Sequence, residues 1–179
     1  MPKYLNILFS VVAIIAIIIA QLAFINGLPL HLANLNIVLI IIILLISLGS
    51  LEKTLWWAIG LGLLFDFFSF EPFGLYLSSL FITVLFMRLL LNNFVTNRSL
   101  YSFLTLTFFG TLCFEFCVYA ISYASRFFSR QDFILELTAG FWQQEAANIF
   151  VNLAAMVIIF YLVNFLSRRF RPVFLVRRK

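Results

Sequence analysis

The chain has 179 residues, of which 64% are hydrophobic and only 11% are charged, with a formal net charge of +5. A soluble domain typically has ~45–50% apolar and ~25% charged residues, and a soluble sphere of this size has too little interior for so many Leu, Ile and Phe side chains. This composition excludes a soluble enzyme, a disordered tail, a disulfide scaffold and a nucleic-acid-binding module. It predicts an all-α membrane protein with several spans and one domain.

Three apolar segments come first along the chain, each near the ~20 residues that a helix needs to cross a bilayer. The first predicted span covers 4–25 and holds no charged side chain. Gly and Pro break the chain at 26–29, and the second span covers 32–51, ending where charged residues begin at Glu52. The third span covers 54–70 and opens with a Trp pair, which is typical of the headgroup region.

Three further spans are predicted in the rest of the chain. The fourth, 74–91, follows a tight turn, and the fifth covers 100–123. The segment 124–144 mixes aromatic and charged residues and is expected at the membrane interface, before the sixth span at 145–166. The tail 167–179 is basic and is expected to contact the anionic lipids of the inner leaflet. Its cations are Arg168, Arg169, Arg171, Arg177, Arg178 and Lys179.

The distribution of cations predicts the orientation of these six spans. With six spans the two termini share one side of the membrane. Of the 12 Lys and Arg residues, only Arg126 and Arg130 fall on the opposite side. Because Lys and Arg are enriched in cytoplasmic loops, both termini are expected in the cytoplasm. The net positive charge is therefore interpreted as a signal of topology and lipid contact, not as a surface for a polyanion.

Several polar side chains fall inside predicted spans, where an ionisable group normally faces protein, a cavity or a partner. Asp66 lies near the outer end of the third span, with Gly62 one turn before it, where a second helix can approach closely. Glu115 lies in the outer half of the fifth span, and Asn148 and Asn152 lie at the outer end of the sixth. These residues are predicted to form either one polar cluster, serving as a cavity or docking seat, or separate hydrogen-bonded packing contacts.

Small side chains recur at helical spacing in two of the spans, which favours close helix packing. In the first span the stripe is formed by Ala13, Ala16, Ala20 and Ala23. In the fifth span it is formed by Gly110, Cys113, Cys117 and Ala120. Since Glu115 and Thr111 lie on the opposite face, the fifth span is expected to be central and covered by protein on both faces. The two cysteines are interpreted as packing residues, because the sequence gives them too few partners for a metal site.

One short segment resembles a known family. The run Gly60-Leu-Gly62-Leu-Leu-Phe-Asp66 and the following Glu71-Pro72-Phe-Gly74 resemble the pattern of the bacterial rod-shape-determining membrane protein MreD family. The resemblance implies a non-enzymatic, multi-pass scaffold of the bacterial cytoplasmic membrane that acts in cell shape and peptidoglycan elongation. It implies a bitopic MreC-like partner and, through it, MreB filaments and the peptidoglycan elongation synthase pair. Gly62, Asp66, Pro72 and Gly74 would then shape the outer hairpin of the third and fourth spans.

Two other functions stay open at this point. The MreD family is also similar to the substrate-binding subunits of energy-coupling-factor transporters, which share a six-helix fold. That similarity suggests a vitamin-binding transporter subunit, with an outward pocket lined by Asp66, Glu115 and Asn152. An intramembrane enzyme that uses Asp66 and Glu115 is a weaker alternative, because the sequence lacks a nucleophile motif or a metal cluster. No cofactor is expected.

Overall fold

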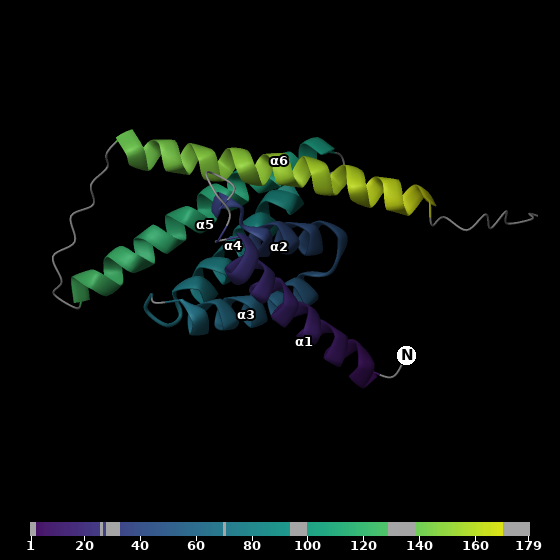
Figure 1. Ribbon diagram of the computed structural model, residues 1–179, viewed down its shortest axis with the longest axis horizontal. Helices are drawn as coiled ribbons and strands as arrows, with labels where there is room; N and C mark the ends of the chain where they lie inside the picture. The colour runs from purple at the N-terminus through teal and green to yellow at the C-terminus, as the bar shows by residue number, and fades with distance from the viewer. Residues whose placement is uncertain are drawn as a thin grey trace, which may run out of the picture.

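The computed structural model describes residues 3–25, 27, 33–69, 71–93, 100–128 and 139–169, and it is all-helical over those residues, with no β-strand among them. The helices pack as a bundle from which α1 and the long α6 extend (Figure 1). In chain order they are α1 (Lys3–Ile19), the π-helix η1 (Ala20–Ile25), α2 (Ile37–Leu48), α3 (Leu51–Phe68), α4 (Leu75–Asn93), α5 (Leu100–Phe128) and α6 (Ala139–Arg169).

Helix α2 forms the centre of the bundle. It packs against α3, α4 and α5, and Leu39, Ile40, Ile42 and Ile43 are fully buried. Its sequence is apolar all round, which is typical of a helix surrounded by others. The predicted fifth span, α5, is covered on its polar face and on its small-residue face, because it packs against α2, α4 and α6 and both Thr111 and Gly110 are buried, but the most deeply buried helix is α2. One side of α5 is open to the surroundings of the molecule, where Phe116 is 73% exposed.

The boundary between α2 and α3 also differs from the prediction of spans at 32–51 and 54–70. Helix α2 has 12 residues and is thus about 18 Å long, shorter than the ~30 Å hydrocarbon core of a bilayer. It begins after Asn36, whose side chain accepts a hydrogen bond from the Leu39 amide at 2.9 Å and so caps the helix. Glu52 does not end α2 but lies in the first turn of α3, where its negative charge interacts favourably with the positive end of the helix dipole.

The N-terminal helix α1 runs outward from the side of the bundle (Figure 1). It packs on α3 through a buried face that includes Ile18, with Ile14 and Ile17 beside it. The alanine stripe lies elsewhere: Ala16 and Ala23 are exposed, and Ala13 and Ala20 are half-buried. Contacts within the bundle therefore use the isoleucine face of α1, because the larger side chains fill the space against α3.

Three of the described helices are long and apolar enough to cross a membrane, which is consistent with a multi-pass membrane protein. These are Leu75–Asn93, Leu100–Ser125 and Phe141–Val163. Both ends of the predicted interfacial segment 124–144 are helical, since α5 continues to Phe128 and α6 begins at Ala139. The predicted basic tail is mostly outside the described residues. Arg168 and Arg169 end α6 without described side chains, and Arg171, Arg177, Arg178 and Lys179 lie beyond it.

Candidate functional site

The turn between α3 and α4 is organised by the carboxylate of Asp66, which is only 4% exposed. Its Oδ1 accepts a hydrogen bond from the Tyr76 amide at 2.8 Å, and its Oδ2 accepts from the amides of Gly74 at 3.1 Å and Leu77 at 3.2 Å. The first amides of a helix lack partners within the helix itself. Asp66, from the last turn of α3, therefore caps α4 across the hairpin and places its negative charge at the positive end of that helix.

Two glycines allow this arrangement. Gly74 has φ +94°, a left-handed conformation that side chains other than glycine rarely adopt, and it turns the chain into α4. Gly62 faces α4 one turn before Asp66, and a Cβ built there would lie 2.6 Å from the Leu77 Cα. A backbone contact this close requires glycine. The hairpin is closed by a hydrogen bond from the Leu75 amide to the Pro72 carbonyl at 3.2 Å.

Aromatic side chains connect the hairpin to α5. The ring of Tyr76 lies 4.5 Å from the ring of Phe65 on α3 and 6.5 Å from that of Phe114 on α5, measured between centroids. At the tip, Phe67 and Phe73 meet edge-on at 5.4 Å, and both are largely exposed. The tip thus presents apolar rings outward while Tyr76 fixes the base of the hairpin against α5.

Glu115 lies beyond this aromatic contact, between the hairpin and α6. It is half-buried and close enough to Tyr76 and to Glu145 for electrostatic interaction with each. Four residues further along α5, the Tyr119 hydroxyl donates a hydrogen bond to Glu145 Oε1 of α6 at 2.8 Å. The two carboxylates therefore occupy the interface of α5 with α6, with tyrosine side chains beside them.

Asn152 belongs to a second polar network, at the start of α2. Its Oδ1 accepts a hydrogen bond from the Asn36 amide at 2.9 Å, and its Nδ2 donates to Thr111 Oγ1 on α5 at 3.5 Å. Gln21 in η1 completes the network: its Oε1 accepts from the Ile37 amide and its Nε2 donates to the Leu35 carbonyl, each at 2.9 Å. Side chains from two other helices, η1 and α6, thus satisfy the partly buried N-terminal end of α2, and Thr111 of α5 holds Asn152 in place.

The structure brings the predicted polar residues together in part. Asp66 and Glu115 flank the same tyrosine, Tyr76, whereas Asn152 is bonded in the separate network at α2. Asn148 is half-buried on α6, one turn from Asn152. Sequence reasoning missed Gln21 and Asn36. The available signal was an amide within an apolar span, because such a group has to find a hydrogen-bond partner in protein.

Most of the small residues in the stripe on α5 pack against neighbouring helices. Gly110 is buried, and a Cβ there would lie 3.0 Å from Met87 Sδ and 3.5 Å from Ile43 Cδ1. The Thr83 hydroxyl of α4 is 4.0 Å from Cys113 Sγ, and Cys117 is buried, with neither cysteine in a disulfide. Ala120, at the end of the stripe, is exposed. These small side chains let α5 approach α4 and α2 closely.

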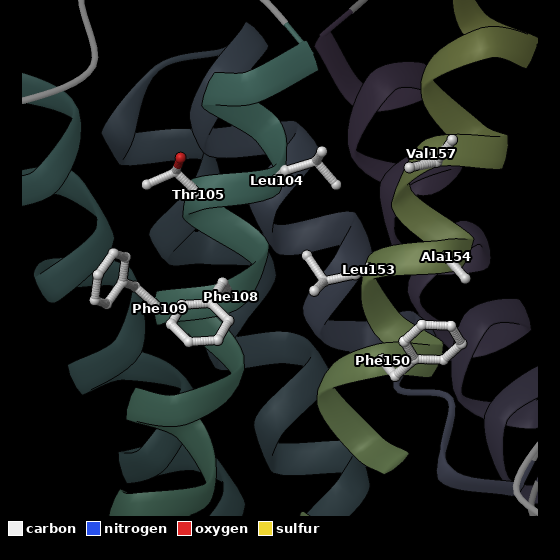
Figure 2. Close-up of a pocket in the computed structure, with 8 residues that line it drawn as sticks. All are labelled: Leu104, Thr105, Phe108, Phe109, Phe150, Leu153, Ala154 and Val157. Carbon is white, nitrogen blue, oxygen red and sulfur yellow. The ribbon is translucent and has the colours of Figure 1, made fainter. Parts of the chain in front are cut away.

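A groove of about 570 Å³ lies between α5 and α6 (Figure 2). Figure 2 shows side chains of both helices along it, with Phe108 and Phe109 on α5 and Phe150 on α6. Its remaining lining residues are Leu104, Thr105, Leu153, Ala154 and Val157. The lining is almost entirely apolar, and Asp66, Glu115 and Asn152 are not part of it.

Within the part of the chain that the structure describes, no three His, Cys, Asp or Glu side chains are grouped so that they could hold a metal ion. No family model matches the chain, and comparisons with curated proteins and with solved structures find no match.

Proposed function

We propose that the protein is a non-enzymatic, six-span scaffold of the bacterial cytoplasmic membrane, with both termini in the cytoplasm. On this proposal it acts in the cell-shape and peptidoglycan elongation machinery and binds a bitopic MreC-like partner. MreB filaments and the elongation synthase pair would be reached through that partner. The observation that carries the proposal is the Asp66-capped hairpin, whose Gly62, Asp66, Pro72 and Gly74 are the residues of the MreD-like pattern.

The chemistry of the hairpin supports a structural role for those residues. The carboxylate of Asp66 has backbone amide donors on both oxygens, so its hydrogen bonding is directed to the fold and not to a substrate. Such a cap makes the hairpin rigid, and a rigid apolar tip bearing Phe67 and Phe73 suits contact with another membrane protein better than catalysis.

The vitamin-binding alternative receives less support from the same residues. Its predicted pocket uses Asp66, Glu115 and Asn152, yet Asp66 and Asn152 are buried and engaged in hydrogen bonds within the chain. A small-molecule site needs several convergent polar groups that are free to bind the ligand. The groove between α5 and α6 supplies almost none, because its lining is apolar.

Affinity purification of the full chain from membranes in mild detergent tests the proposal. A bitopic protein with a large extracytoplasmic domain is expected to co-purify. Co-purification of a transporter ATPase module, or of a tightly bound vitamin, would instead favour the alternative and overturn the scaffold. Cells that lack the protein are expected to lose their rod shape, and the full chain is expected to restore it.

A matched pair of variants connects this test to the hairpin. Asp66→Asn replaces a carboxylate oxygen that accepts amide hydrogen bonds, whereas Glu52→Gln makes the same chemical change at an exposed position in the first turn of α3. Asp66→Asn is expected to reduce recovery of the partner although the protein still inserts, and Glu52→Gln is expected to leave recovery unchanged. Equal recovery of the partner with both variants would show that the Asp66 cap is not needed for partner binding.

A further inference from the structure

Polar side chains on α5 and α6 face each other at helical spacing. On α5 they are Thr111, Glu115 and Tyr119, each four residues from the next. On α6 they are Glu145, Asn148 and Asn152, three and four residues apart. This spacing puts each set on one face of its helix. Two of the facing pairs are in contact, Tyr119 with Glu145 at 2.8 Å and Thr111 with Asn152 at 3.5 Å.

These two contacts fix the alignment of the helices. Moving eight residues back along α5, from Tyr119 to Thr111, moves seven residues forward along α6, from Glu145 to Asn152. The helices are therefore antiparallel. Halfway between the two contacts, Glu115 on α5 comes opposite Asn148 on α6. Both of these side chains are half-buried, as expected for residues at the interface between the two helices.

We propose that Thr111–Asn152, Glu115–Asn148 and Tyr119–Glu145 form a polar ladder of three rungs that locks the register of α6 against α5. In the middle rung the Asn148 amide donates a hydrogen bond to the Glu115 carboxyl group after a rotation of the two side chains. The ladder does not depend on the proposed scaffold function. Glu145 also faces Glu115 from α6, and Tyr76 faces it from α4.

A lock is needed because the rest of this interface has little to define its register. Apolar side chains contact lipid about as favourably as they contact one another, so two apolar helices in a membrane can slide, and interhelical hydrogen bonds select one alignment. Among the described residues α6 packs chiefly against α5. The ladder, together with the hydrogen bond from the Asn36 amide to Asn152, therefore attaches the last helix to the bundle.

The groove between α5 and α6 depends on the same register. It continues from the ladder along the two helices, with Phe109 of α5 and Phe150 of α6 in its walls (Figure 2). A slip by one helical turn displaces α6 by ~5.4 Å and would bring a different set of side chains against Leu104, which points from α5 towards α6 (Figure 2). The ladder is thus a conformational device that shapes the groove, although it contributes no lining residue to it.

A double-mutant cycle on the purified full chain tests the middle rung, with the melting temperature in detergent as the readout. Glu115→Ala and Asn148→Ala are expected to lower the melting temperature singly, and the double variant is expected to lose no more than the worse single variant, because partners in one contact are not additive. The Tyr119→Phe and Glu145→Ala cycle serves as the reference for an existing rung. Fully additive losses at Glu115 and Asn148 would overturn the middle rung.

Cross-linking tests the register and does not require a stability change. In a background with Cys113→Ala and Cys117→Ala, cysteines are introduced at positions 115 and 148, or at 115 and 155, and treated with a short bifunctional thiol reagent. Position 155 is seven residues, or ~10 Å, further along the helix from 148. The 115–148 pair is expected to cross-link at least about fivefold faster, since the register brings it into contact and moves 155 away. Equal rates, or faster reaction of the 115–155 pair, would overturn the lock.

Discussion

At the scale of single residues, the Asp66 carboxylate stands out because it accepts hydrogen bonds from three backbone amides. Replacement by Ala leaves the amides of Gly74, Tyr76 and Leu77 without their acceptor in a buried turn. An unsatisfied buried donor costs about 1–3 kcal/mol, so Asp66→Ala is expected to lower the free energy of unfolding by at least that amount. Thermal melting in detergent measures the loss. Asp66→Asn keeps one acceptor oxygen and is expected to lose less; if both variants lose equally, the amide bonds do not account for the effect.

The close approach of α3 to α4 predicts opposite outcomes for two glycines in the same helix. At Gly62 an added Cβ meets the Leu77 backbone at 2.6 Å, which side-chain movement cannot relieve, so Gly62→Ala is expected to destabilise the fold by about 1–3 kcal/mol. At Gly60 the nearest atom is the flexible end of Ile14 at 3.0 Å. Because Ala favours a helix over Gly by about 1 kcal/mol, Gly60→Ala is expected to be neutral or stabilising. Equal melting temperatures for the two variants would contradict this account.

At the scale of elements, the start of the central helix α2 is held by hydrogen bonds with side chains of other helices. Gln21→Leu removes the acceptor for the Ile37 amide and the donor to the Leu35 carbonyl. Faster hydrogen exchange is expected in the first turns of α2, measured by mass spectrometry, together with a lower melting temperature. Ser47→Ala is the control near the other end of the same helix. Ser47 Oγ is buried without a hydrogen-bond partner among the described residues, so its removal is expected to be neutral or stabilising.

Helix α2 also shows how much of the fold can be predicted from the sequence. Hydropathy locates helices well where polar residues flank an apolar run: α4 covers Leu75–Asn93 against a predicted 74–91. It overextends α2, because the chain before Asn36 is also apolar and only the cap defines where the helix begins. The depth of a helix in the bundle is partly visible in the sequence, because α2 is apolar all round whereas α5 carries Thr111 and Glu115. Which helices surround α2 follows only from the packing.

The candidate site could also be predicted only in part from the sequence. The spacing of Gly62, Asp66, Pro72 and Gly74 is visible in the sequence, and it marks a hairpin. The three hydrogen bonds that Asp66 accepts from backbone amides could not be predicted from that spacing. They depend on the geometry of the turn, because the φ of +94° at Gly74 directs the start of α4 back towards α3. Tyr76, Tyr119 and Gln21 were missed because each bonds a residue on another helix, and such pairing is set by packing across the bundle.

At the scale of the whole molecule, the short α2 raises the question of whether this helix crosses the membrane. A helix of about 18 Å does not reach across a ~30 Å hydrocarbon core by itself, so the six-span proposal requires the residues before Asn36 to complete the crossing. If α2 crosses with them, Gly27 and Phe73 lie on the outer side and Lys53 lies in the cytoplasm. If α2 stays within one leaflet, Gly27 and Lys53 lie on the same side.

Single cysteines at positions 27, 53 and 73, in a background with Cys113→Ala and Cys117→Ala, distinguish the two arrangements in intact cells. A membrane-impermeant thiol reagent is expected to label positions 27 and 73 directly, and position 53 only after the membrane is permeabilised. Gly27, Lys53 and Phe73 are all exposed residues, so access to the reagent depends on the side of the membrane and not on burial. Labelling of 53 together with 27 in intact cells would show that α2 returns to the side it came from, and the six-span topology would be wrong.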